Sequence, residues 1–391
     1  MLRKVRVGVI FGGRSGEHAV SLMSARSIME AIDPERFEVV PIGITQEGRW
    51  LKTGDPWKAL REGISEQNGV PVALLGETAS PSVAAEATTR PDAAGRTDGP
   101  RVPAVVEPSL PTQAVSLTEQ VDVVFPVLHG TYGEDGTIQG LLEMAGLPYV
   151  GAGVLGSALG MDKAMAKAVW ERFGLPVSRY VVVTRSECER TPEAVAARVE
   201  GSFAYPVFVK PANAGSSVGV SKAKNREQLT AALDLACRYD RKVLVEEFIN
   251  GREVECSVLG NDDPIASLPG EVVPCNEFYD YKAKYIDGDS ALIIPAELPP
   301  DVTQKVRDTA VAAFKALDLA GMARVDFFVT RDGNRPILNE VNTIPGFTSI
   351  SMYPKLWEAT GLSYRELVTR LIELAIERYR DRQRSSTTYE V

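Results

Sequence analysis

The sequence predicts an α/β protein built from two or three compact units. A chain of 391 residues is longer than one ordinary domain. Short apolar runs typical of buried strands alternate with stretches of helical periodicity, starting with the strand Val5 to Phe11 and a helix that extends to about Ala31. Glycine-rich loops follow several of the strands, which is typical of α/β proteins that bind small ligands.

The composition excludes several classes of protein. A net charge of −9 argues against a nucleic-acid surface or an anionic membrane as partner. The four cysteines are far apart and form no Cys-x-x-Cys pair, so we interpret them as packing residues in a reducing compartment. The apolar run near the N-terminus contains Arg6 and ends in glycines, which favours a first strand over a signal peptide. No stretch is long enough to span a bilayer, and we predict a cytoplasmic protein.

The first unit is predicted to cover residues 1–151. The first strand leads into the loop GGRSGEHAVS and a helix, and EVVPIGIT and the region of Trp50 continue the unit. From about residue 76 to 117 the chain consists mainly of Ala, Pro, Thr, Ser and Gly. Such a segment cannot bury enough apolar surface to offset chain entropy, so we expect a flexible surface insertion. The run VDVVFPVLHG then predicts another strand that enters a glycine-rich loop.

The second unit is predicted over residues 152–242 and the third over residues 243–380. The second contains one helix, SALGMDKAMAKAVWERFG, followed by the strands RYVVV and PVFVKPA. The third begins near VLVEEFI and ends with an amphipathic helix over residues 363–380. The remaining tail, residues 381–391, is expected to be disordered.

The stretch GAGVLG, from Gly151 to Gly156, matches the dinucleotide-binding pattern G-x-G-x-x-G. The match is weak, because no acidic residue ends a second strand about 20 residues later. We therefore interpret these residues as a hinge that leads into a helix.

The segment ARVDFFVTRDGNRPILNEVNTIPG, residues 323–346, predicts a β-hairpin with charged residues inside its strands. A three-residue loop, 332–334, would place Asp326 opposite Glu340, whereas a two-residue loop would place it opposite Asn339. Two facing carboxylates repel each other unless a cation lies between them. With the amide of Asn342 they form part of an oxygen shell suited to Mg²⁺, and the alternative is a solvated hairpin face. The neighbouring Arg324 favours a site for metal and phosphate.

Two further segments face a nucleotide in this interpretation. KPANAGSSVGVSK offers a lysine at a strand end and a loop of small residues whose N–H groups can approach phosphate. The alternative is an ordinary hairpin turn, since the G-K-[ST] ending of a Walker A loop is missing. VLVEEFINGREVE could offer backbone groups to adenine and Glu253 to a ribose, or could be a plain amphipathic edge.

Eight motifs together resemble the D-alanine–D-alanine ligase family of the ATP-grasp superfamily. They are GGRSGEHAVS, HGTYGEDGTIQG, MDKAMAK, KPANAGSSVG, EEFINGREVE, EFYDYKAKY, ARVDFF and NEVNTIPGFTSISMYP. The resemblance extends from about Val5 to Arg380, and only the segment 76–117 departs from the pattern. It implies a three-domain ATP-grasp fold, in which an N-terminal parallel-sheet domain binds substrate and two α+β subdomains clamp ATP.

The activity implied by the resemblance is the ligation of two D-alanine molecules for peptidoglycan precursor synthesis. ATP would phosphorylate the carboxylate of the first D-alanine, and the amine of the second would attack the acyl phosphate. The implied cofactors are ATP and two Mg²⁺ ions, with Mn²⁺ as a possible substitute. Relatives suggest a homodimer.

The resemblance also assigns roles to individual residues. Glu17 would hold the first ammonium group, Ser216 and Tyr285 would bond to Glu17, and His129 would orient the first substrate. The other implied roles are as follows: phosphate or nucleotide binding by Lys163, Lys210 and Ser217; contact with the transferring group, within the substrate site, by Lys284; adenine binding by Glu246, Phe248 and Ile249; ribose binding by Glu253; metal binding by Asp326, Glu340 and Asn342; oxyanion binding by Arg324 and Gly346; and binding of the second carboxylate by Ser351 and Met352.

Three alternatives stay open at this point. One is a ligase that joins D-alanine to D-lactate on the same fold, against which Tyr285 argues because depsipeptide-forming relatives depart from Tyr there. Another is a different ATP-grasp carboxylate–amine ligase, in which EFYDYKAKY and TSISMYP would be unexpected. The last is a non-catalytic nucleotide-binding protein, which would have no reason to retain Glu17, Ser216 and Arg324 together.

Overall fold

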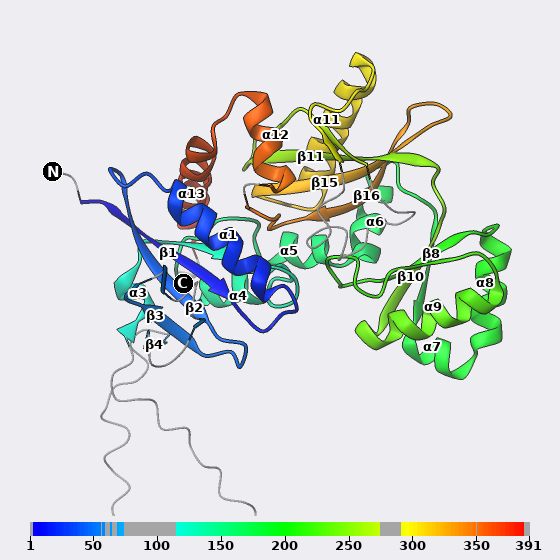
Figure 1. Cartoon of the computed structure of the whole chain (residues 1–391), viewed down its shortest axis with the longest axis horizontal. Coiled ribbons are helices and arrows are strands. Elements are labelled where there is room, and N and C mark those ends of the chain that lie inside the picture. Colours follow the sequence, from blue (N-terminus) through cyan, green and yellow to red (C-terminus); the bar gives the residue numbers. More distant parts are fainter. Residues whose placement is uncertain are drawn as a thin grey trace, which may run out of the picture.

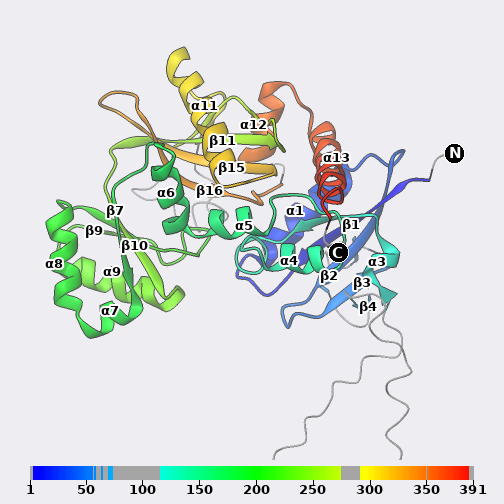
Figure 2. The ribbon, with the colours of Figure 1, turned by 180° about the vertical axis from the view of Figure 1, so that it is seen from behind.

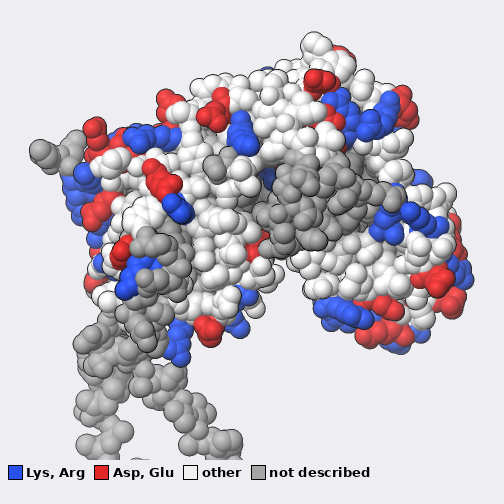
Figure 3. Space-filling model, viewed as in Figure 1, with Lys and Arg blue, Asp and Glu red and all other residues white. Residues whose placement is uncertain are grey.

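A computed structural model describes residues 3–55, 57–58, 63–64, 69–73, 115–273, 291–348 and 350–386. Its described part contains three β-sheets, each with helices packed against it (Figure 1). The α/β class expected from the sequence is confirmed. On the face shown in Figure 3, basic and acidic side chains are interspersed.

The N-terminal unit is built on a sheet with the strand order β5-β4-β3-β2-β1-β6. Its core strand β1 is parallel to both β2 and β6, as the apolar run at the start of the sequence predicts. The elements of this unit are β1 (Val5–Gly12), α1 (His18–Ala31), β2 (Phe37–Ile44), β3 (Trp50–Thr53), β4 (Gly69–Ala73), β5 (Val115–Ser116), α3 (Leu117–Gln120), β6 (Val123–Val127) and α4 (Thr137–Met144).

The central sheet has the antiparallel order β7-β10-β8-β9 and is covered by α7, α8 and α9. The elements of this region are α5 (Val154–Met161), α6 (Lys163–Arg172), β7 (Tyr180–Thr184), α7 (Arg185–Arg190), α8 (Pro192–Ser202), β8 (Val207–Pro211), β9 (Ser221–Ala223), α9 (Arg226–Tyr239) and β10 (Lys242–Glu247).

The third sheet has the order β14-β13-β11-β15-β16, with β12 paired to β11. Its elements are β11 (Gly251–Gly260), β12 (Ile265–Ala266), β13 (Gly270–Val273), β14 (Ala291–Ile293), α11 (Pro300–Ala316), β15 (Gly321–Thr330), β16 (Pro336–Asn342), α12 (Met352–Thr360) and α13 (Tyr364–Arg382). Helix α13 lies between the N-terminal and third sheets in both ribbon views (Figures 1 and 2). Its residues Leu367 and Leu371 share one core with Val7 of β1 and Met322 of β15, so the two units are packed together.

Two expected boundaries differ from the structure. The segment VLVEEFI was expected to open the third unit, but its strand β10 pairs with β7 and β8 in the central sheet. The expected single helix after Gly156 is divided into α5 and α6 at Asp162, whose side chain accepts hydrogen bonds from the N–H groups of Ala164 and Met165. The carboxylate caps a new helix there, and Trp170 of α6 packs into the core of the third sheet.

The expected insertion and tail also differ at their edges. Val115–Ser116 pair with β4, and the side chain of Leu117 is buried, so the residues that end the predicted insertion belong to the fold. The segment 74–114 lies outside the described residues. At the other end of the chain α13 continues to Arg382, which is within the predicted tail, and residues 387–391 lie outside the described residues.

In the hairpin of β15 and β16, the predicted pairing of the two acids arises from a longer loop and a bulge, and not from a three-residue loop. Asp326 lies opposite Glu340, but Thr330 N–H donates to the Arg335 carbonyl, so residues 331–334 form the loop. This loop is one residue longer than predicted, and Asn334 is its left-handed residue. A bulge between Asp326 and Phe327 leaves Asn339 as the extra residue of β16 and restores the register.

None of the helices in the described ranges is both long and apolar enough to cross a membrane.

Candidate active site

A cleft of about 950 Å³ opens among the three sheets. All candidate residues that the structure describes line this cleft, and they come from every unit of the chain. They are Glu17, His129, Lys163, Lys210, Ser216, Ser217, Glu246, Phe248, Ile249, Glu253, Arg324, Asp326, Glu340, Asn342, Gly346, Ser351 and Met352. Lys284 and Tyr285 lie outside the described residues.

The β15–β16 hairpin brings charged side chains to one wall of the cleft. Arg324 donates two hydrogen bonds of 2.7 Å to the Asp326 carboxylate and lies 2.9 Å from the Glu255 carboxylate. Burial opposes the charge of the guanidinium, but the two acids raise the pKa of Arg324 well above its usual range. Asn342 donates to Asp326 at 3.0 Å, so two of the three expected metal-binding side chains are in contact.

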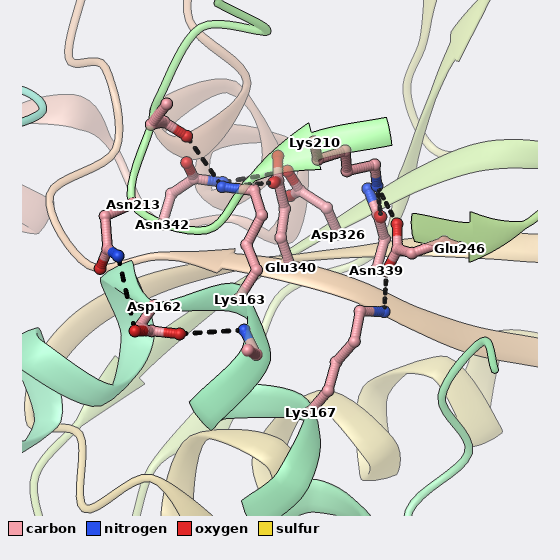
Figure 4. Close-up of polar contacts among 12 residues, drawn as sticks. Asp162, Lys163, Lys167, Lys210, Asn213, Glu246, Asp326, Asn339, Glu340 and Asn342 are labelled. Atoms are coloured by element: carbon pink, nitrogen blue, oxygen red, sulfur yellow. Dashed lines mark hydrogen bonds and ion pairs between the residues drawn. The ribbon is translucent and has the colours of Figure 1, made fainter. Parts of the chain in front are cut away.

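Lys163 connects this wall to the central unit. Its Nζ donates to the Ala214 carbonyl at 2.8 Å and lies 3.3 Å from the Glu340 carboxylate (Figure 4). The lysine occupies the first position of α6, directly after Asp162, whose carboxylate caps the helix and pairs with Lys242. The cap therefore fixes Lys163 between the acidic hairpin and the loop 212–217.

A row of three buried charged residues, with Glu246 between Lys167 and Lys210, lies in the central unit beside the cleft (Figure 4). The Glu246 carboxylate lies 2.8 Å from Lys167 Nζ and 2.6 Å from Lys210 Nζ. Burial disfavours the carboxylate, but the two lysines lower the pKa of Glu246 to about 2. Lys167 also donates to Ser178 at 2.9 Å, and Lys210 donates to the bulge residue Asn339 at 2.9 Å.

Aromatic side chains lie beside this charged row. The ring of Phe248 stacks on that of Phe208, with centroids 6.2 Å apart, and Lys222 Nζ lies 4.8 Å from the Phe248 centroid. Phe248 retains 42% of its exposure, although it is a large apolar residue. An exposed ring at the edge of a cleft is suited to contact a flat ligand such as a purine.

The opposite end of the cleft is formed by two glycine-containing loops around Glu17. Ser216, which has a left-handed backbone, donates a short hydrogen bond to the Glu17 carboxylate. A Cβ at Gly130 would lie 2.5 Å from the same carboxylate. The loops therefore need a small residue there so that Glu17 and Ser216 can meet.

His129 and Glu134 follow β6 and contact the segment 343–348 on the other side of the cleft. His129 Nδ1 lies 3.0 Å from the Ile344 carbonyl, and burial lowers the pKa of the imidazole. The Glu134 carboxylate accepts hydrogen bonds from the N–H groups of Gly130 at 2.8 Å and Ile344 at 3.0 Å. Burial, together with the charge of Glu17, raises the pKa of Glu134 to about 7.

The last group of candidate residues surrounds Gly346. A Cβ on this glycine would lie 3.0 Å from Ser351 Oγ, so a larger residue would displace the serine. Ser351 Oγ accepts a hydrogen bond from the Thr348 N–H at 3.0 Å. Ser351 precedes α12, which begins at Met352, so both residues lie at the N-terminal end of that helix.

The donor set on the hairpin fits a magnesium ion. Asp326 and Glu340 supply carboxylate oxygens and Asn342 supplies an amide oxygen, which are the hard donors that Mg²⁺ prefers. In the described part of the chain, no cluster of three or more His, Cys, Asp or Glu residues forms a metal site. The hairpin offers two carboxylates and one amide oxygen, and Mg²⁺ usually completes such a donor set with water and phosphate oxygens.

Four residues of the site were not predicted from the sequence: Lys167, Glu134, Asn339 and Ser24. Lys167 follows Lys163 by one helical turn, so a search for charged residues at this spacing could have found it. Glu134 lies inside the motif HGTYGEDG and was not singled out there. Asn339 accepts a hydrogen bond from Lys210, and Ser24 accepts one from the Phe347 N–H beside the cleft. Both contacts join distant segments, so no local pattern marks these residues.

Two family models match this chain and together cover most of it. Residues 6–152 match the model described as the N-terminus of D-ala D-ala ligase, and residues 169–373 match the model of its C-terminus.

Curated proteins and solved structures agree with these matches. The chain is 52% identical over 381 residues to the D-alanine–D-alanine ligase of Acetivibrio thermocellus, covering 97% of each chain, and 49% identical over 388 residues to that of Natranaerobius thermophilus, covering 99% of each. The structure of the D-alanine–D-alanine ligase from Coxiella burnetii is similar with a TM-score of 0.79 and 36% identity, over 97% of this chain and 96% of that one. The VanG D-Ala:D-Ser ligase from Enterococcus faecalis is similar with a TM-score of 0.77 and 37% identity, over 95% of this chain and 100% of that one.

Both halves of the chain match models of one family, and full-length relatives share about half of the residues. The chain therefore belongs to the D-alanine–D-alanine ligase family.

Proposed function

We propose that this member of the D-alanine–D-alanine ligase family joins two D-alanine molecules in two steps inside the one cleft. In the first step a carboxylate oxygen of D-alanine attacks the γ-phosphorus of ATP, and ADP leaves. In the second step the amine of another D-alanine attacks the carbonyl carbon of the acyl phosphate, phosphate leaves, and the new amide nitrogen loses a proton. The observation that carries the proposal is the meeting, in one cleft, of the Glu17–Ser216 pair, the acidic hairpin and two lysines.

The nucleotide binds at the central wall in this proposal. Lys163 and Lys210 contact its phosphates, as does the loop that contains Ser217, because these residues line the same cleft. Glu246, Phe248 and Ile249 surround adenine, and Glu253 binds the ribose. The ion pair of Lys163 with Glu340 supports a role for this lysine beside the transferring phosphate.

Asp326, Glu340 and Asn342 would hold two Mg²⁺ ions, and Mn²⁺ could replace them. When bound, the ions supply positive charge that neutralises the phosphate oxygens during transfer. In the structure Asp326 accepts hydrogen bonds from Arg324 and Asn342, which hold its carboxylate on the wall of the cleft.

The two D-alanine molecules bind at the other end of the cleft. The Glu17 carboxylate, held by Ser216, binds the ammonium group of the first, and His129 lies on the same side. Arg324 and the N–H of Gly346 stabilise the oxyanion that forms when the amine attacks. Ser351 and the N-terminal end of α12 at Met352 bind the carboxylate of the second, where the helix dipole favours an anion. Tyr285 and Lys284 complete the site in this proposal, although both lie outside the described residues.

We further propose that the protein is a cytoplasmic homodimer, by analogy with the family. Light scattering of the purified protein tests the oligomeric state.

The activity is tested by incubating the protein with ATP, Mg²⁺ and D-alanine. Phosphate release and D-alanyl-D-alanine, identified by mass spectrometry, are the expected results. Mixtures that contain D-serine or D-lactate with D-alanine measure the choice of acceptor, and D-alanyl-D-alanine should be the main product near neutral pH. A dominant product with D-lactate would contradict the proposed function.

A further inference from the structure

The segment around Gly346 is held on both sides by residues of the N-terminal unit. On one side, the N–H of Ile344 donates to Glu134 at 3.0 Å, and the carbonyl of Ile344 faces His129 Nδ1 at 3.0 Å. On the other side, the N–H of Phe347 donates to Ser24 Oγ at 3.2 Å. Both neighbouring peptide groups are therefore anchored to a different unit of the protein.

Ser24 and His129 join these two anchors to each other. Ser24 Oγ lies 3.1 Å from His129 Nε2, and the exposed fraction of Ser24 is 0%. One arrangement of hydrogen atoms satisfies every group: Phe347 N–H donates to Ser24, the Ser24 hydroxyl donates to Nε2, and Nδ1–H donates to Ile344. This arrangement needs a neutral imidazole, and burial lowers the pKa of His129 in that direction.

We propose that Ser24, His129 and Glu134 are positioning residues that fix the N–H of Gly346 for the oxyanion of the second step. The inference rests on the proposed function, in which Gly346 is a donor to that oxyanion. His129 then serves the reaction through Ile344 rather than by direct contact with the first D-alanine. The N-terminal unit thereby controls a donor that belongs to the third unit.

These positioning residues should therefore affect the rate of the second step and not the binding of the substrates. An oxyanion donor acts only when charge develops on the carbonyl oxygen, and it must be held in place beforehand. A displacement of about 1 Å can reduce the rate about 100-fold. Loss of the Ser24 hydroxyl should therefore lower kcat while leaving the KM values for ATP and D-alanine nearly unchanged.

Ser21 provides a matched control for Ser24. It lies one helical turn earlier in α1, its exposed fraction is also 0%, and its hydroxyl also bridges two backbone groups. Its partners are the Gly12 N–H, at 2.8 Å, and the Val127 carbonyl, neither of which belongs to the segment 343–348. Ser24→Ala and Ser21→Ala therefore remove the same group from the same helix with similar effects on packing.

The experiment compares the two variants with the wild type by steady-state kinetics and by hydrogen exchange of the peptide that covers residues 343–348. We expect Ser24→Ala to lower kcat about 10-fold or more, with KM values within about 2-fold, and to accelerate exchange in that peptide. Ser21→Ala should leave kcat and the exchange of this peptide close to those of the wild type.

Two outcomes would overturn the inference. One is equal exchange in the two variants, which would mean that Ser24 does not hold the segment. The other is faster exchange in Ser24→Ala with an unchanged kcat, which would mean that the segment needs no such positioning. A wild-type protein that releases no D-alanyl-D-alanine would instead overturn the proposed function. The exchange data would still show whether Ser24 holds the segment 343–348.

Discussion

Two glutamates at opposite ends of the cleft have opposite pKa shifts. Glu246, at the nucleotide end, lies between Lys167 and Lys210, and its pKa is lowered to about 2. Glu134, at the substrate end, receives its hydrogen bonds from the backbone N–H groups of Gly130 and Ile344, and its pKa is raised to about 7. Burial acts in the same direction on both carboxyls, so the partners account for the difference.

The comparison separates two ways to hold a carboxylate inside a cleft. Two lysines lower the pKa of Glu246 to about 2, so its carboxylate is charged near neutral pH, and one of them, Lys210, also lines the cleft. Backbone N–H groups position Glu134 without a full counter-charge, so its ionisation depends on pH. We therefore expect the nucleotide end to respond mainly to the removal of charge, and the substrate end mainly to pH.

The largest effect is expected where charge is removed from the nucleotide end at the hairpin. Glu340→Gln keeps the shape of the side chain but removes the charge that faces Lys163 and the proposed metal site. We expect phosphate release at limiting Mg²⁺ to fall about 100-fold or more, since metal charge stabilises the transferring phosphate. Asp332→Asn, in the exposed loop of the same hairpin, is the control and should retain full activity. Normal turnover of Glu340→Gln at low Mg²⁺ would refute the metal assignment.

The next largest effect is expected when one of the two lysines that contact Glu246 is removed. Lys167→Met preserves much of the buried volume but leaves Glu246 with Lys210 alone. Breaking a buried ion pair costs about 3–5 kcal/mol, so we expect a lower melting temperature. We also expect the KM for ATP to rise about 10-fold, because Lys210 must then neutralise Glu246 as well as bind phosphate; about 1.4 kcal/mol corresponds to such a change.

The double variant Lys167→Met/Glu246→Gln shows whether this effect comes from the charges. The double variant leaves the buried Lys210 without Glu246, its ion-pair partner at 2.6 Å, so it should be less stable than Lys167→Met alone, in which that pair remains. If the two substitutions lower the melting temperature additively, the ion pair does not couple these residues.

The pairing of Asp326 with Glu340 shows both what the sequence can predict and where prediction fails. Strand alternation placed the two acids on one face, and the pairing was predicted from a loop of the wrong length. The longer turn is compensated by the bulge at Asn339, whose side chain contacts Lys210 of the central sheet. A bulge that depends on a partner 129 residues away leaves no local signal in the sequence.

The same limit applies to the unit boundaries. The run VLVEEFI predicts a strand correctly, but the strand's partners, β7 and β8, precede it in the chain. Periodicity identifies an element and does not specify which sheet the element joins. The motifs, by contrast, place chemical groups at strand ends and in glycine-rich loops, which is why the candidate residues described by the structure line one cleft.

A smaller effect is expected from the glutamate at the substrate end. The pKa of Glu134 rises from an ordinary 4.5 to about 7 on folding, so the folded state binds this proton more tightly than the unfolded state. The resulting stabilisation is complete below pH 4.5 and is lost as the pH rises to about 7. Glu134→Gln does not titrate, so the melting temperature of the wild type relative to the variant should fall by a few degrees between pH 5 and pH 8.

This measurement depends on the other groups that face Glu134. Glu17 and Lys163 are the charged neighbours that act on its carboxyl, and both remain in the variant, so their own titration largely cancels in the difference. A difference in melting temperature that stays constant across this range would show that Glu134 keeps one protonation state and is held like Glu246.

The smallest effect is expected from shortening the segment 74–114, which lies outside the described residues. The described strands on either side of the segment 74–114 are neighbours, because Val72 of β4 pairs in parallel with Val115 of β5. A Gly/Ser linker of about 12 residues is long enough for a parallel crossover between such strands. The cost of closing a loop changes by only about 0.6 kcal/mol for each doubling of its length. Replacing residues 76–113 with this linker should therefore leave both the melting temperature and the KM values for ATP and D-alanine nearly unchanged.

The linker must stop before Val115, because a replacement that extends through Leu117 would remove a buried side chain and a strand pair, and should lower the melting temperature. If the shorter replacement raised the KM for either substrate, residues of the segment would have to contact the cleft. The different pKa shifts of the glutamates at the two ends of the cleft could then not be explained by Lys167, Lys210 and the backbone donors alone.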